Sequence, residues 1–340
     1  MDRNEGRGKE EGGRGGGRMM AWVEEIQQLG LSPYLLEKIP LLRNARTIQM
    51  LVIRQTHDYS IFRTEETREL NTVTIPRSIK DPEPVVKVVF LASKQKAPEN
   101  RMYSNLFRTY AQDLGIEFEG EVSSCRLKDK LCRKCPRCVL FGAVVTEEGR
   151  SEQRWNIKHR IEYSSAYSVE PYEDVAEIIT FNAVDPATQS TGRALGYTEN
   201  IEPIVNFPSV VTLNSITEEE FIWYIKTLLA TKSYGAETRV KGDVVNEIIG
   251  IIAGYEEIIT SLELNLELSA IEGNLEGLSD ILKKYKQLAA FPDNVLVLSS
   301  EETKGLINAI RRFGPDEEFL KSLRDKTIDF HDRVSKEARL

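Results

Sequence analysis

The sequence predicts an α+β protein whose core is a ferredoxin-like, RRM-like antiparallel sheet with helices. Two apolar runs rich in β-branched residues, Thr47–Ile53 and Val85–Leu91, are typical of buried strands. Helical spacing follows in 100–114, and a Thr-x-x-Glu capping box at Thr217 opens a second helix. A hairpin expected over 244–268 completes the order strand, strand, helix, helix, strand, strand, which is compatible with that sandwich.

The two ends of the chain are expected to lie outside this core. Residues 1–18 are mostly Gly, Arg and Glu, so we expect a disordered tail, and a short helix is expected near Trp22–Leu29. The closing hairpin is predicted from Val244–Ala253 and from Ile258–Leu268, where leucines alternate with polar residues. Residues 269–340 are highly charged and are expected to form a C-terminal helical region.

The middle of the chain carries short polar strands and turn residues, which we interpret as two insertions. The expected division has a discontinuous RRM-like core, 19–116 with 217–268. Between its halves lie a zinc-binding insertion, 117–160, and a lid or thumb insertion, 161–216.

Composition limits the classes of function. With 340 residues, 41% of them hydrophobic, the chain can bury a substantial core, and its net charge of −8 argues against coating nucleic acid with the whole surface. Charge is nevertheless uneven, because residues 126–137 hold six basic groups and one acid, Asp129. No stretch approaches the ~20 apolar residues of a membrane span, and no secretory signal is present. We therefore expect a cytoplasmic protein without a membrane partner.

Four cysteines form the clearest chemical motif, Cys125-x6-Cys132-x2-Cys135-x2-Cys138. Crowded cysteines in a reducing compartment favour metal over disulfides, and the C-x2-C spacing lets two thiolates reach one ion. Four thiolates leave no position for water, so the motif predicts one structural zinc ion per chain. An iron–sulfur centre and a metal-free loop stay open as alternatives.

The sequence offers little for catalysis. Its three histidines are His57, His159 and His331, and the pairs His57-Asp58 and His331-Asp332 lack the further ligands of a phosphohydrolase. Nucleotide-binding, serine-hydrolase and zinc-protease motifs are absent. A protein without enzymatic activity is therefore expected.

Cations near the predicted strand ends indicate an RNA-binding groove. Arg54 follows the first strand, and Lys94 and Lys96 follow the second. The segment from Lys232 to Arg239 joins the capped helix to the predicted hairpin, and a Gly-rich stretch suits a mobile finger. Such cations with aromatic side chains hold single-stranded RNA. The predicted RNA-binding residues are Arg54, Lys94, Lys96, Arg193, Lys232, Tyr234 and Arg239.

Several strings of residues together resemble a known family. Cys-Arg-Lys-Cys-Pro-Arg-Cys at 132–138, followed by Leu140-Phe-Gly142, resembles the backbone subunit of type I-D CRISPR effector (Cascade) complexes. Further similar strings follow in the family's order and extend the resemblance over roughly residues 45–265. They are Thr180-Phe-Asn-Ala183, Phe207-Pro-Ser-Val210, Thr231-Lys-Ser-Tyr-Gly-Ala236 and Gly250-Ile-Ile-Ala-Gly254.

The resemblance implies a RAMP-type subunit that stacks along CRISPR guide RNA and holds the RNA backbone without cleaving it. Its implied partners are guide RNA, other effector-complex subunits, further copies of itself and, indirectly, target DNA. The spacing of the first cysteine varies in the family, so Cys125 is the least secure ligand. The alternatives are a CRISPR RNA-processing endoribonuclease that uses His57 as general acid or base, and a redox or iron–sulfur protein.

Overall fold

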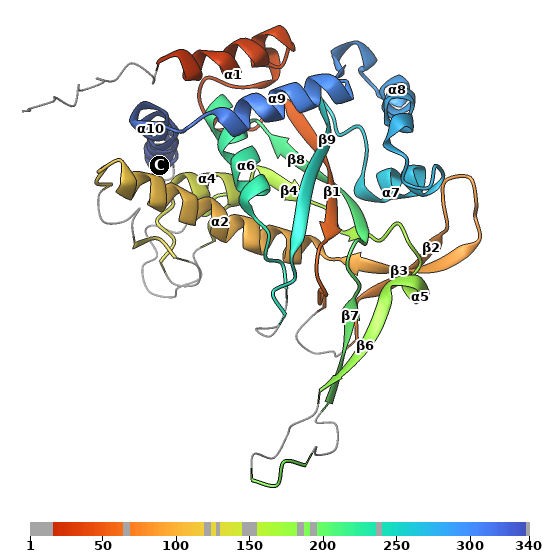
Figure 1. The fold of residues 1–340 in the computed structure, drawn as a ribbon. Helices are drawn as coiled ribbons and strands as arrows, with labels where there is room; N and C mark the ends of the chain where they lie inside the picture. The colour runs from red at the N-terminus through yellow and green to blue at the C-terminus, as the bar shows by residue number, and fades with distance from the viewer. Residues whose placement is uncertain are drawn as a thin grey trace, which may run out of the picture.

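The structure is a computed structural model that describes residues 16–63, 69–118, 124–126, 130–144, 155–181, 187–190, 196–235 and 240–337, with side chains from Trp22 onward. It is a mixed α+β fold with antiparallel sheets (Figure 1). The helices are α1 (Gly16–Gln28), α2 (Ala92–Asp113), α4 (Pro136–Phe141), α5 (Tyr172–Val175), α6 (Glu218–Ala230), α7 (Ser261–Ser269), α8 (Leu278–Leu288), α9 (Ser300–Arg312) and α10 (Glu317–Glu337). Short 3₁₀ helices are η1 (Ser32–Tyr34), η3 (Leu275–Gly277) and η4 (Pro292–Asn294).

A five-stranded antiparallel sheet forms the centre of the molecule. Its strands are β1 (Thr47–Thr56), β4 (Ile161–Tyr163), β8 (Asn206–Asn214), β9 (Val244–Gly254) and β10 (Leu296–Val297), in the order β10-β9-β1-β8-β4. β1 pairs along its length with both β8 and β9, and the β9 register shifts between Leu51 and Val52. Its apolar run is continuous because neighbours bury it on both sides and both faces.

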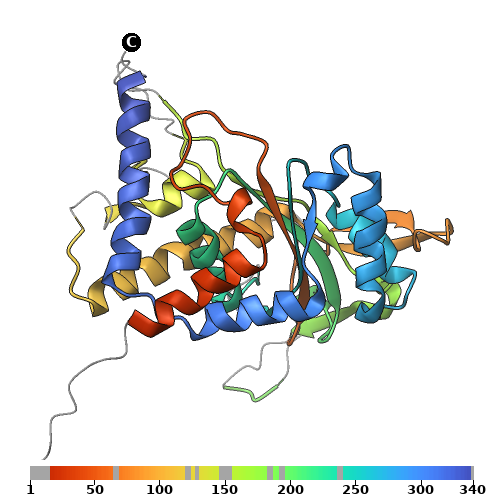
Figure 2. The same cartoon turned by 90° about the horizontal axis from the view of Figure 1, so that it is seen from above.

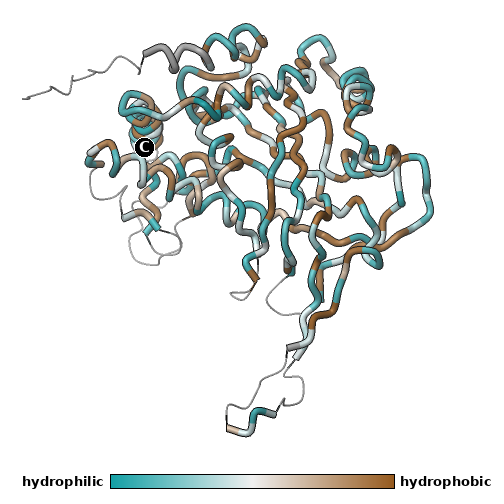
Figure 3. Tube along the Cα trace, viewed as in Figure 1, coloured by the Kyte–Doolittle hydropathy of each residue, from teal (hydrophilic) through white to brown (hydrophobic). Residues whose placement is uncertain are grey.

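Helices cover both faces of this sheet (Figure 2). One face packs against α1, α2, α4, α6, α9 and α10 in a core that includes Met50, Val211 and Trp223. On the other face, Leu51 and Val210 pack against α7 and α8. Successive side chains of a strand point to opposite faces, so Met50 and Leu51 serve different cores. Hydrophobic residues are accordingly concentrated on the central strands (Figure 3).

A second sheet and a two-stranded arm lie at the Thr56 end of β1. The sheet contains β2 (Thr72–Pro76), β3 (Pro84–Phe90) and β5 (Ala166–Tyr167) in the order β2-β3-β5. The arm pairs β6 (Ala176–Phe181) with β7 (Gly196–Ile201) and projects away from the body (Figure 1). Phe62, Phe90 and Phe207 pack at the junction, where the first two rings stack 3.8 Å apart.

The predicted closing hairpin is only half right. β9 confirms its first strand, but the second segment forms helix α7 instead. The hydroxyl of Thr260 accepts from the N–H of Glu263, whose carboxylate accepts from the N–H of Thr260, so a capping box starts the helix. Leu264 and Leu268 are both buried at helical i, i+4 spacing, which the alternating leucines had concealed.

Other boundaries also differ from the expectation. The second predicted strand, β3, belongs to the smaller sheet, whereas β8, placed in the lid insertion, is a central strand of the main sheet. The prediction for 161–216 is therefore wrong at β4 and β8. α1 begins at Gly16, inside the expected tail, and the rest of that tail lies outside the described residues. The capping box at Thr217 and helix α6 are confirmed.

None of the described helices combines the length and apolar character required to cross a membrane.

Candidate metal centre and nucleic-acid interface

The four cysteines of the motif converge on one point. Their Sγ atoms all lie within 4.8 Å of one another. The Sγ of Cys125 is 3.4 Å from that of Cys138 and 3.7 Å from that of Cys135. A tetrahedral ion with metal–sulfur bonds of about 2.3 Å would need its sulfurs about 3.8 Å apart. The set therefore fits a single four-coordinate ion.

Local backbone geometry aims these thiols inward. The N–H groups of Lys134 and Cys135 donate to the Sγ of Cys132, at 3.4 and 3.2 Å. Cys135 is the N-cap of α4, and its Sγ accepts from the N–H of Cys138 at 3.5 Å. Pro136 at the first helical position suits this start because a proline needs no hydrogen-bond acceptor there. Hydrogen bonds of this kind stabilise thiolates, the form that binds metal.

The cysteine site, which we call the knuckle (Cys125, Cys132, Cys135 and Cys138), is tied into the protein core. Three of its cysteines are buried, and Cys138 belongs to the same core as the main sheet. The pKa of Cys138 is lowered, first by hydrogen bonds from the other three cysteines and also by the Arg137 guanidinium. The hydrogen bond from Cys132 contributes most to lowering the pKa of Cys125, to about 7. A closed, buried set of this kind can hold a metal ion structurally.

Arg54 does not lie where the sequence predicted. It belongs to β1, and its side chain is 0% exposed. Its Nη1 donates to the Glu99 carboxylate at 2.6 Å and to Asn246 Oδ1 at 3.1 Å, and its Nε donates to Ser209 at 2.9 Å. Burial is the largest single influence and lowers the pKa of Arg54, but Glu99 and the three surrounding tyrosine hydroxyls together raise it by more, so the guanidinium stays charged. The expectation of a direct RNA contact by Arg54 is therefore wrong in this arrangement.

Tyr234 is buried in the same cluster. Its hydroxyl donates to Glu99 Oε1 at 2.9 Å, while the hydroxyls of Tyr163 and Tyr224 each donate to Glu99 Oε2 at 2.6 Å. Burial and then Glu99 raise the pKa of Tyr234 well above its usual value, which keeps it a neutral donor. Because Tyr234 is only 3% exposed, its ring cannot stack on a base, and the prediction that it contacts RNA directly is wrong in this arrangement. We call this buried set around Arg54 and Glu99 the strand-end network.

The remaining predicted RNA-binding cations divide into three groups. Lys232 is exposed where α6 is joined to β9. Lys94 and Lys96 are half-buried in the first turns of α2, which starts earlier than predicted. Burial and then the charge of Arg137 lower the pKa of Lys96. Arg193 and Arg239 lie outside the described residues.

The segments that carry Lys94 and Lys232 meet at one end of the sheet. The ring of Phe90, just before α2, contacts that of Tyr234 with centroids 5.6 Å apart. The N–H of Val244, the first residue of β9, donates to the carbonyl of Lys232. Because Val244 pairs with Thr56, this end is also where the β6–β7 arm begins.

Sequence reasoning missed Glu99, the residue on which the strand-end network depends. The helix was predicted to begin at Asn100, so Glu99 fell just outside it. α2 in fact begins at Ala92, in spite of Pro98, and carries Glu99 into the interior. No local signal marks a glutamate that the fold will bury.

The three histidines lie apart, each with neighbours of its own among the described residues. The Nε2 of His57 lies 3.0 Å from the Gln55 side chain, and the Nδ1 of His331 lies 3.0 Å from Asp332. Burial and then the charge of Lys96 lower the pKa of His159. His159 is not among the residues that converge on the knuckle.

Comparison with known proteins gives both a family and a fold. The Csc2 CRISPR family model matches residues 34–332. The crystal structure of Thermofilum pendens Csc2 is similar at 21% identity with a TM-score of 0.66, covering 93% of this chain and 97% of that one. No curated protein matches the chain.

Two further solved structures are more distant. A chain of a CRISPR RNA-guided surveillance complex has 11% identity and a TM-score of 0.44, covering 71% of this chain and 83% of its own. A chain of a type IV-B CRISPR complex has 14% identity and a TM-score of 0.40, covering 60% and 90%. Because the family model spans most of its length, the chain belongs to the Csc2 CRISPR family.

Proposed function

We propose that this chain is a non-catalytic, cytoplasmic backbone subunit of a type I-D CRISPR effector complex. In this role several copies of the chain bind along one guide RNA, next to other effector subunits. Target DNA pairs with the RNA that the chain holds. The observation that carries the proposal is the family match over residues 34–332. The short strings at the knuckle and at Thr231–Ala236 support the type I-D assignment.

The core supports an RRM-like assignment. Along the chain the order is β1, α2, β4, β8, α6, β9, and in the sheet it is β9-β1-β8-β4. That path and strand order are those of a ferredoxin-like sandwich with both helices on one face. RRM proteins stack bases on the open face of their sheet, but here α7 and α8 cover that face. We therefore propose that RNA binds beside the sheet and not on this face.

The end of the sheet near Thr56 is the proposed place for guide RNA. Lys94, Lys96 and Lys232 lie on the segments that meet there, and we assign Arg239 and Arg193 to the same groove and to its thumb. Cations on phosphates suit a protein that must hold any guide sequence. The strand-end network then serves as the support that fixes these segments.

The knuckle is proposed to hold one zinc ion. Four thiolates within 4.8 Å of one another match a single ion better than a multi-iron cluster, whose ligands must stand further apart. When bound, the metal supplies structural cross-linking without an open coordination position. Cys125, Cys132, Cys135 and Cys138 would hold it, and we assign them to a zinc-binding insertion between α2 and β4.

The test is length-dependent binding of unstructured RNA by the full chain. We expect affinity to be independent of sequence and to fall steeply with salt as counterions are released. The same RNA should stay intact during incubation. Binding that is indifferent to salt, or cleavage lost on His57→Ala, would contradict the proposal in favour of sequence-specific binding or of an endoribonuclease.

A further inference from the structure

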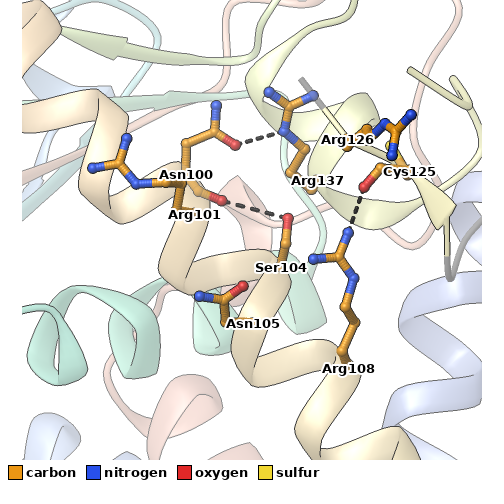
Figure 4. Close-up of a pocket in the computed structure, with 8 residues that line it drawn as sticks. All are labelled: Asn100, Arg101, Ser104, Asn105, Arg108, Cys125, Arg126 and Arg137. Atoms are coloured by element: carbon orange, nitrogen blue, oxygen red, sulfur yellow. Dashed lines mark hydrogen bonds between the residues drawn. The ribbon is translucent and has the colours of Figure 1, made fainter. Parts of the chain in front are cut away.

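A cavity of about 270 Å³ lies between α2 and the knuckle. Four arginines line it: Arg101 and Arg108 from α2, and Arg126 and Arg137 from the knuckle segment (Figure 4). Asn100 and Asn105 add amide groups, and none of the described residues that line the cavity carries a carboxylate. We call this site the arginine cavity.

The buried member of the arginine cavity is Arg137, whose side chain forms no ion pair with any carboxylate of the described residues. The residue is 7% exposed, its Nε donates to Asn100 Oδ1 at 2.6 Å, and its Nη1 lies 3.7 Å from Cys138 Sγ. Among the described residues its Nη2 has no hydrogen-bond partner. Because Asn100 Oδ1 accepts the hydrogen bond from Arg137, the side-chain NH₂ group of Asn100 can donate to a ligand in the cavity.

The other arginines are available for an anion. Arg108 donates to the carbonyl of Cys125, which ties the wall of the cavity to the knuckle. Arg101 and Arg126 are exposed, and neither side chain forms an ion pair within the part of the chain that the structure describes. Guanidinium groups gathered without acids repel one another, and a bound anion with several oxygens would relieve that repulsion.

A row of side chains along one face of α2 runs from the sheet end toward the arginine cavity. Lys96, Asn100, Ser104 and Arg108 follow one another at i, i+4 spacing, so their side chains form a row along the helix. This row begins beside the segment that carries Lys94 and ends at the cavity. A strand that follows α2 from the sheet end would therefore bring its phosphates to the cavity.

We infer that the arginine cavity binds a phosphate group of a single-stranded nucleic acid. The source of the phosphate rests on the proposed function, whereas the anion chemistry rests on the cavity alone. Arg137 lies between the cavity and Cys138, so the knuckle positions one wall of the phosphate site. The metal insertion would then have a part in binding beyond its own folding.

The test compares exposed variants of α2 in the full, metal-loaded chain. Arg101→Glu and Asn105→Asp change exposed side chains that are not part of the knuckle. Lys304→Glu is the matched control, because it makes the same charge change at an exposed position of α9. The probes are a fluorescent oligouridylate and inorganic phosphate, with metal content measured for each protein.

We expect Arg101→Glu to weaken oligouridylate binding about ten-fold and to lower the salt slope by about 0.7. Asn105→Asp should weaken it in the same direction, and Lys304→Glu should change affinity by about two-fold or less. Equal affinities for Arg101→Glu and Lys304→Glu would overturn the assignment to a nucleic acid.

The experiment with inorganic phosphate distinguishes failure of this inference from failure of the proposed function. If inorganic phosphate raises the Tm of the wild type but not of Arg101→Glu, while oligouridylate affinity is unchanged, the site takes a free anion and the strand assignment fails. If the wild type binds no RNA, the proposed function fails, and protection by phosphate that depends on Arg101 still supports the anion site. Absence of both effects overturns the inference completely.

Discussion

The knuckle and the strand-end network are both polar sites in the protein interior, but they are assembled in different ways. All four knuckle cysteines come from Cys125–Cys138, and neighbouring N–H groups orient their sulfurs. The strand-end network draws Arg54, Glu99 and Tyr234 from segments up to 180 residues apart. The knuckle is local in sequence, and the network exists only in the folded chain.

This difference explains why the four cysteines lie together, as their spacing predicted, whereas Arg54 does not lie where it was expected. Spacing alone brings the cysteines together, because a short loop and one helical turn complete the ligand set. The sequence spacing of the predicted RNA-binding cations does not determine where they lie in the fold. One cation near the end of the sheet can be buried while another is exposed. Arg54 became a buried partner of Glu99, while Lys232 stayed at the surface.

Breaking the knuckle should have the largest effect. Cys138→Ser removes one ligand of the proposed zinc site, and structural zinc contributes about 10–16 kcal/mol in zinc-finger peptides. We expect metal content to fall well below one ion per chain and the free energy of unfolding to drop sharply. Elemental analysis and urea denaturation measure the two effects. Val144→Ser, at an exposed position nearby, is the control, and unchanged metal content in Cys138→Ser would contradict the assignment.

Breaking the strand-end network should come second. Glu99→Leu leaves the buried Arg54 without its carboxylate, and breaking such a pair costs about 3–5 kcal/mol. Urea denaturation should show this loss, and Arg54→Met combined with Glu99→Leu should recover part of it. The exposed pair of Arg77 and Glu83 is the control, because Glu83→Gln should cost about 1 kcal/mol or less. Equal losses for the two pairs would refute the contrast between buried and exposed charge.

A glycine at the sheet end offers a smaller perturbation. A Cβ on Gly235 would lie 2.3 Å from the carbonyl oxygen of Val240, so Gly235→Ala must displace the backbone that follows Lys232. We expect a loss of about 1–3 kcal/mol together with weaker RNA binding. Gly314→Ala serves as the control, since no atom lies within 4 Å of its Cβ. Wild-type stability in Gly235→Ala would show that the segment after Lys232 tolerates a side chain at this position.

The smallest expected effect concerns the groove itself. Lys232 is exposed, so Lys232→Ala should change the free energy of unfolding by only about 0.5 kcal/mol. It should nevertheless lower the slope of log affinity against log salt by about 0.7, as expected for one lost phosphate contact. Fluorescence titration with RNA at several salt concentrations measures this slope. An unchanged slope would remove Lys232 from the groove.

Local signals predicted several elements correctly. The capping box at Thr217 and the apolar run at Thr47 each act over a few residues, and helix α6 and strand β1 confirm them. The four-cysteine spacing brings the thiols together, and the zinc ion that it predicts stays a prediction. A second capping box, at Thr260, is also present in the sequence, but the alternating leucines after it led to the prediction of a strand. Helix α7 shows that a start signal together with i, i+4 burial carries more weight than a short alternation.

By itself, the sequence determined the convergence of the four cysteines, strands β1 and β9, and the start of helix α6, because these depend on cysteine spacing, hydrophobic runs and a capping box that neighbouring residues supply. Only the tertiary structure decided that β8 is a central strand, that α7 and α8 cover the second face of the sheet, and that Arg54 is buried against Glu99. The physical reason is that strand pairing and burial depend on residues far apart in the chain. The function of a cation depends in turn on whether the fold leaves it in water.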